Sequence, residues 1–94
     1  MESKFGKKLR AFREAHKIKI MDLAYDLRIT YTALSNLELG YKKPSLDFLF
    51  KLSKRFGLDR EAEEEFEILA GYIPRDIIDI LQDHPEILKE LRAK

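Results

Sequence analysis

The sequence of 94 residues contains no cysteine, only four glycines and three prolines, and no long apolar run. Without cysteine the chain can form neither a disulfide framework nor a thiolate metal site. No stretch approaches the roughly 18–20 apolar residues that a membrane-spanning helix requires. Residues 1–8 are polar and do not fit a signal peptide. From these absences we expect a cytoplasmic protein with a single domain and one modest core.

The residue patterns of catalysis and metal binding are also missing. The four glycines are scattered, so there is no glycine-rich phosphate loop. His16 and His84 have no partner at metal-ligand spacing, and Ser35 and Ser45 lack a base within a recognisable motif. The glutamates at 63–65 are interpreted as one side of a helix. We therefore expect no enzyme, no catalytic residue, no bound metal and no cofactor.

Charge is nearly balanced overall, at a net +1, but it is divided unevenly along the chain. Residues 1–57 contain 13 lysines and arginines against 6 acidic residues, whereas residues 58–94 contain 5 against 11. A basic first half is what binding to nucleic-acid phosphates requires. The acidic second half is interpreted as a solvated surface or a surface for protein contact.

Two short helical patterns meet between residues 21 and 44, with only residues 28–30 between them. Thr30 is a good N-cap for the second helix, and Gly40 can end it in the left-handed conformation. Two helices joined by so short a turn form a helix-turn-helix unit. The apolar residues that share the inner faces of the two patterns are Leu23, Ala24, Leu27, Leu34 and Leu37.

The outward positions of the second helix are short, polar and mostly uncharged. They are Tyr31, Thr32, Ser35 and Asn36. Such side chains suit hydrogen bonding to base edges in a major groove. Asn36 can hold an adenine edge through two hydrogen bonds, and the methyl group of Thr32 suits a thymine methyl.

With these motifs in place, residues 5–58 resemble the phage-repressor type of helix-turn-helix domain, the XRE family. The landmarks follow one another at family spacing: Leu9, Arg13, Leu23, Ala24, Ile29, Thr30, Leu34, Leu37, Glu38, Gly40, Pro44, Ser45, Leu49 and Gly57. The resemblance implies an all-α fold, a compact lambda-repressor-like domain with about two or three additional C-terminal helices.

The resemblance also implies roles for single residues. Arg13 would pair with Glu38 as a structural clamp. The bases would be contacted by Tyr31, Thr32 and Asn36, and the phosphates by Lys19, Ser35, Lys42 and Lys43. For the two loop lysines a solvated turn is the alternative.

The sequence departs from the family at the start of the second helix. The family often has a Ser or Thr cap followed by a glutamine that reaches a phosphate, but Lys19 and Ile20 occupy these positions. Lys19 offers a point charge, which gives less positional control than a fixed hydrogen bond. We expect this helix to begin near Ile20 without a capping side chain.

The flanking helices follow from caps and periodicity. The first should run from Lys4 to His16. A later helix should begin after the cap Ser45, run to Phe56 and end at Gly57. Its expected buried stripe is Leu46, Leu49, Phe50, Leu52 and Phe56.

Residues 59–94 continue as helices. A domain of this family is already complete at residue 58, so the aliphatic residues of the last helices exceed what its core needs. Asp59 can cap a helix that ends near Ala70, and Pro74 can open the next. The surplus must cover the domain's flank or meet a second subunit, and we favour a homodimer. We thus divide the chain into a DNA-binding domain, residues 1–58, and an extension, residues 59–94, that packs on it and forms a dimerisation element. The expected dimer interface is Ile77, Ile78, Leu81, Ile87, Leu88 and Leu91.

The function that follows is a sequence-specific regulator of transcription. It would bind double-stranded DNA at a two-fold operator as a homodimer and act as a repressor. The alternative is a protein-interaction or antitoxin-like module with weak or no DNA binding, which would bind a second protein through the C-terminal helices. Ile20 and Leu39 motivate this alternative, because both are apolar where the family is often polar.

Overall fold

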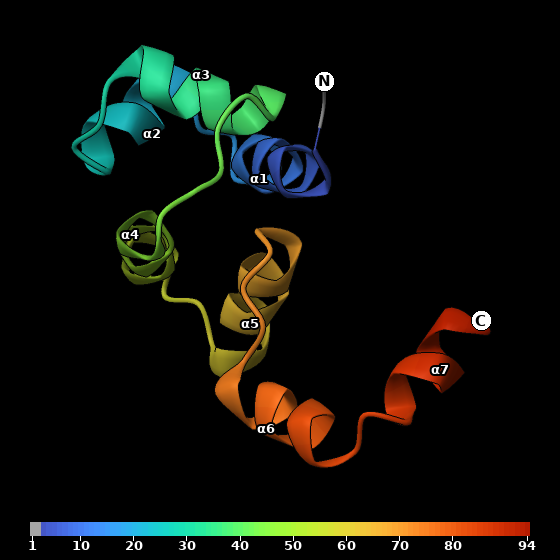
Figure 1. Ribbon diagram of the computed structural model, residues 1–94. Helices are drawn as coiled ribbons and strands as arrows, with labels where there is room; N and C mark the ends of the chain where they lie inside the picture. Colours follow the sequence, from blue (N-terminus) through green and yellow to red (C-terminus); the bar gives the residue numbers. More distant parts are fainter. Residues whose placement is uncertain (1–2) are drawn as a thin grey trace.

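In the computed structural model, residues 3–94 are described, and they form seven α-helices and no strand (Figure 1). The all-α expectation is confirmed. The helices are α1 (Lys4–Ala15), α2 (Ile20–Asp26), α3 (Tyr31–Leu39), α4 (Leu46–Phe56), α5 (Arg60–Leu69), α6 (Arg75–Asp83) and α7 (Ile87–Arg92).

Local capping explains where most of these helices begin and end. The hydroxyl of Thr30 accepts from the Ala33 amide at 3.0 Å, and Ser45 and Asp59 cap α4 and α5 in the same way. Helix α3 ends at Gly40 with φ of 84°. The start of α2 at Ile20 is as expected, and Lys19 makes no side-chain capping bond.

The core lies between α1, α2, α3, α4 and α5. Phe66 of α5 is fully buried, with its ring centroid 5.9 Å from that of Phe5 and 5.5 Å from that of Phe12. Burial of one such side chain stabilises a fold by about 1.5–3 kcal/mol. Helix α5 is therefore part of the packed body. The buried apolar residues are Phe5, Leu9, Leu23, Ala24, Leu27, Leu34, Leu37, Phe48, Leu49, Leu52, Phe66 and Ala70.

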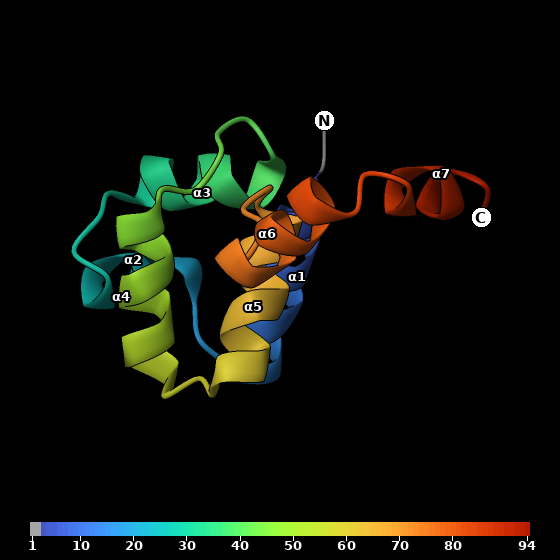
Figure 2. The same cartoon turned by 60° about the horizontal axis from the view of Figure 1, so that its bottom comes forward.

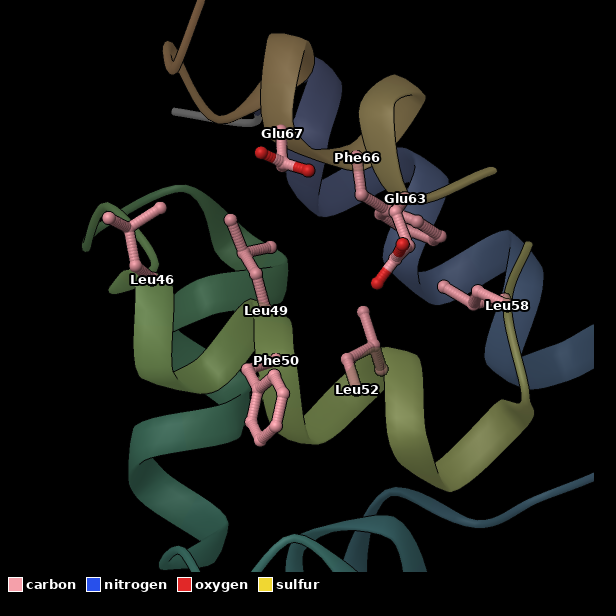
Figure 3. A pocket seen from close by; sticks show the side chains of 8 residues that line it. All are labelled: Leu46, Leu49, Phe50, Leu52, Leu58, Glu63, Phe66 and Glu67. Carbon is pink, nitrogen blue, oxygen red and sulfur yellow. The ribbon is translucent and has the colours of Figure 1, made fainter. Parts of the chain in front are cut away.

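The buried stripe expected on α4 is wrong at two positions. Leu46 and Phe50 are 58% and 57% exposed, whereas Leu49 and Leu52 are buried. A cleft of about 170 Å³ between α4 and α5 separates Leu46 and Phe50 from Glu67 on the opposite wall (Figure 3). Helix α5 covers only the part of the stripe nearest its own Phe66, so the side chains at the outer edge remain in solvent.

The C-terminal extension divides into a packed part and a projecting part. Helix α5 is held on the body by Lys8, whose Nζ lies 3.0 Å from a Glu65 carboxylate oxygen, and by the Ser53 hydroxyl, which donates to Glu63. Helices α6 and α7 contain no buried residue. Helix α7 extends away from the other helices in both views (Figures 1 and 2). Helix α5 therefore packs on the body, whereas α7 projects from it.

Candidate nucleic-acid interface

The turn between α2 and α3 sets the direction of α3. Arg28 takes the left-handed conformation there, with φ of 57°. The Ile29 amide donates to the Ala24 carbonyl at 3.0 Å, and the Arg28 amide donates to that of Tyr25 at 3.1 Å. These bonds close the end of α2 as a left-handed glycine often does. Sequence reasoning missed this conformation, because an arginine gives no signal for it.

Helix α3 separates a buried face from a solvent-facing strip. Leu34 is fully buried against the core. Tyr31 is 53% exposed and Thr32 is exposed, while Ser35 and Asn36 are half-buried. The spacing i, i+1, i+4 and i+5 brings these four side chains together on one side of the helix. We call them the α3 strip.

The expected phosphate-contacting lysines lie at two places in the chain. Lys19 is exposed directly before α2, and Lys42 and Lys43 are exposed in the loop that joins α3 to α4. The Nζ of Lys43 lies 4.2 Å from the ring centroid of Tyr72, which follows α5. Sequence reasoning missed this contact, since nothing local connects the two residues.

Arg13 and Glu38 form a bidentate ion pair between α1 and the end of α3. Arg13 Nε donates to Glu38 Oε2 at 2.7 Å and Nη2 donates to Oε1 at 3.1 Å, while Nη1 donates to the Ile18 carbonyl at 3.0 Å. Glu38 is only 2% exposed, and Arg10 Nε lies 3.5 Å from its Oε1. The hydrogen bond to Glu38 raises the pKa of the Arg13 guanidinium above its usual value, although burial acts in the opposite direction. The pair holds α3 in a fixed position on α1.

Close approach of the two backbones reinforces this position. A Cβ on Gly6 would lie 2.2 Å from the carbonyl oxygen of Glu38 and 2.9 Å from that of Leu37. No side chain fits in this space, so glycine allows α1 to lie directly against α3. Sequence reasoning missed this role, because Gly6 lies within a helix where glycine is otherwise unfavourable.

The residues expected at a dimer interface lie outside the core. Ile77, Leu88 and Leu91 are exposed, and Ile78, Leu81 and Ile87 are half-buried. Ile73 and Ile80 are exposed beside them and were missing from the predicted set. We call these eight aliphatic residues, of which Ile73 precedes α6 and the others belong to α6 and α7, the C-terminal apolar surface.

The described residues contain neither a cluster of metal ligands nor a membrane-spanning helix. Within residues 3–94, no group of three or more histidine and acidic side chains could hold a metal ion. The Nδ1 of His16 lies 2.8 Å from the Phe12 carbonyl, and that of His84 lies 3.3 Å from a Glu86 carboxylate oxygen. No helix in this range is long and apolar enough to cross a membrane.

Comparison with known proteins agrees with this geometry. The model of a protein family described as helix-turn-helix matches residues 9–62, which include α2, α3, the loop and α4. The chain belongs to the XRE-type helix-turn-helix family. This membership supports a DNA-binding regulator.

Among curated relatives of this helix-turn-helix protein is the HTH-type transcriptional regulator DdrOP3 of Deinococcus deserti. It is 31% identical over 85 residues, an alignment that covers 85% of this chain and 66% of the relative. No solved structure matches the chain significantly.

Proposed function

We propose that this protein is a sequence-specific DNA-binding regulator that binds a two-fold operator as a homodimer and represses transcription by occupying a promoter. The observation that carries the proposal is the α3 strip. Its short polar side chains face solvent on a helix that the buried pair of Arg13 and Glu38 holds to the body. Such a rigid, solvent-facing helix suits insertion into a major groove. Action in the cytoplasm belongs to the same proposal.

Within the proposal, bases and phosphates are contacted by different residues. Tyr31, Thr32 and Asn36 contact base edges, which carry the sequence information. The phosphates are contacted by Ser35, Lys19, Lys42 and Lys43, which set the register on the duplex.

The homodimer supplies the spacing between two recognition helices. Half-sites one helical turn apart require the two copies of α3 to lie about 34 Å apart. The C-terminal apolar surface supports this dimer, since Leu91 is 56% exposed and α7 projects from the body. Acidic residues dominate this half of the chain, which favours its placement away from DNA.

A comparison of Asn36→Ala with Lys43→Ala tests the assigned contacts. Lys43→Ala should weaken binding to all sequences and lower the slope of log affinity against log salt by about one unit. Asn36→Ala should cost about 1–3 kcal/mol on the preferred site and relax the preference at one base pair. Lys94→Ala removes the same charge from the chain's far end and should leave the slope unchanged. If Asn36→Ala retained the full base preference, the α3 strip would not be the reading surface.

A protein-interaction module remains the second candidate, and the cleft beside Leu46 and Phe50 favours it. An exposed leucine and phenylalanine on neighbouring turns of one helix offer an apolar contact to another protein. Ile20 no longer supports this alternative, because its side chain packs against the core. Gel shifts on random-sequence duplexes at low and moderate salt separate the candidates, since the module predicts no salt-sensitive shift.

A further inference from the structure

The C-terminal extension reaches the loop between α3 and α4 through Tyr72. The Tyr72 hydroxyl donates a hydrogen bond to the Pro44 carbonyl oxygen at 2.9 Å. Its ring also lies beneath the side chain of Lys43, with the ammonium nitrogen 4.2 Å from the ring centroid. One side chain outside the helix-turn-helix therefore contacts two consecutive residues of the loop that carries Lys42 and Lys43.

Tyr72 is itself held firmly by the end of α5. The Tyr72 amide donates to the Glu67 carbonyl at 2.9 Å, and the Gly71 amide donates to that of Ile68 at 3.0 Å. Gly71 has φ of +92°, so the three features make a Schellman closure of α5. The Tyr72 side chain is half-buried and packs against the core. Its ring is thus a fixed platform rather than a mobile surface group.

This platform changes what Lys43 can do. A lysine side chain loses much rotational freedom when it is ordered at a phosphate, and that loss weakens the contact. The cation–π contact with Tyr72 orders the side chain before DNA arrives. An ammonium group has three N–H donors, so one side can face the ring while others remain available to a phosphate oxygen.

We propose that Tyr72 is a positioning residue that places Lys43 for a DNA phosphate, so that the extension takes part directly in DNA binding. This inference rests on the proposed function. The hydroxyl fixes the loop backbone at Pro44, and the ring fixes the Lys43 side chain. Tyr72 lies in the segment that joins α5 to α6, and Pro74, two residues later, is the N-cap of α6. The residue that contacts the loop is thus close in sequence to the C-terminal apolar surface.

The test measures binding of a random-sequence duplex over a series of salt concentrations by fluorescence anisotropy. Tyr72→Leu removes both contacts, whereas Tyr72→Phe keeps the ring and loses only the bond to Pro44. Tyr72→Leu should weaken binding about 2- to 10-fold and lower the salt slope by up to about one unit, with a smaller change for Tyr72→Phe. In the Lys43→Ala background, Tyr72→Leu should have little further effect. Tyr25→Leu makes the same chemical change at an exposed site on α2 and is the control.

A measurement without DNA accompanies the binding series. In the free protein, the Lys43 side-chain protons nearest the ammonium should show an upfield ring-current shift in the nuclear magnetic resonance spectrum. The shift should persist in Tyr72→Phe and disappear in Tyr72→Leu. Circular dichroism identifies any variant that fails to fold. If Tyr72→Leu does not fold, the affinity and salt slope of the folded Tyr72→Phe variant test the inference in its place.

Three outcomes would overturn the inference while leaving the proposed function intact. Equal effects of Tyr72→Leu with and without Lys43 would mean that Tyr72 acts only through general stability. Tighter binding by Tyr72→Leu would mean that the ring withholds Lys43 from DNA. Unchanged binding would mean that the contact has no part in DNA binding. If the wild-type protein bound no duplex at any salt, the proposed function itself would fail, and the inference would fail with it.

Discussion

At the scale of single residues, the ion pair of Arg13 and Glu38 has the largest expected energetic consequence. The Glu38 carboxylate is buried and accepts two hydrogen bonds from one guanidinium. Removal of Glu38 leaves the mostly buried guanidinium of Arg13 without its carboxylate, which is far more costly than the loss of an exposed pair.

A double-mutant cycle measures this consequence. Glu38→Ala should lower the free energy of unfolding by about 3 kcal/mol or more, and Arg13→Ala with Glu38→Ala should cost less than the two single changes added. Glu64→Ala disrupts the exposed pair with Arg60 and should cost under about 0.5 kcal/mol. Chemical denaturation measures the free energy of unfolding of each variant. Strict additivity of the Arg13 and Glu38 changes would contradict a coupled pair.

The roles of residues that act on their neighbours in the sequence could be predicted from the sequence. The roles of residues that contact distant parts of the chain could not be predicted from residue chemistry alone. Thr30 and Gly40 act on their own helix, so their chemistry alone indicated the start and end of α3. The pairing of Arg13 with Glu38 was expected only through the family resemblance, because 25 positions separate them. The Lys43 contact with Tyr72 had no such support and was missed.

At the scale of elements, the packing of α1 on α3 depends on the absence of a side chain at Gly6. A Cβ there would overlap the Glu38 carbonyl, which belongs to a helix backbone and cannot move alone. The same backbone carries the residues of the α3 strip, so a displaced helix would also displace the proposed reading surface.

Gly6→Ala should therefore destabilise the protein by about 1–3 kcal/mol, despite the higher helix propensity of alanine. Gly57→Ala is the control, because its Cβ meets no atom within 4 Å and the only penalty is the left-handed conformation at φ of 60°. DNA affinity should fall with Gly6→Ala and stay near wild type with Gly57→Ala at temperatures where both remain folded. A Gly6→Ala protein more stable than wild type would show that α1 and α3 separate easily.

Helix ends were predicted better than helix burial. The expected limits of α3 and α4 agree with the structure because capping groups act within one turn. The start of α2 at Ile20 also agrees, although no side chain caps it. Burial of Leu46 and Phe50 was predicted wrongly, since periodicity shows which side of α4 is apolar but not how much of that side α5 covers. The position of α5 is set by Phe66 packing on α1, a contact between distant parts of the sequence.

At the scale of the whole molecule, the basic half carries the α3 strip and the acidic half carries the C-terminal apolar surface. If this surface is a dimer interface, Leu88→Asp with Leu91→Asp should give a folded, helical monomer, because neither leucine is buried in its own chain. Sedimentation reports the mass and circular dichroism the helix content. Gln82→Asp with Lys94→Asp changes charge at polar positions and should remain dimeric.

Two results would contradict the proposed dimer interface. A Leu88→Asp and Leu91→Asp variant that stays dimeric would place the interface elsewhere, with the exposed Leu46 and Phe50 as the next candidates. A variant that unfolds would mean that the leucines stabilise the chain's own body.

Selection of bound sequences from a pool of random duplexes tests most directly whether the protein recognises a two-fold operator as a dimer. The purified full chain is incubated with the pool at moderate salt, and the retained DNA is sequenced after several rounds. Binding as a homodimer should enrich two inverted copies of one half-site, with centres about 10 base pairs apart, or about 34 Å along the helix axis. A single half-site without an inverted partner would contradict the homodimer, and no enrichment over the starting pool would contradict sequence-specific binding altogether.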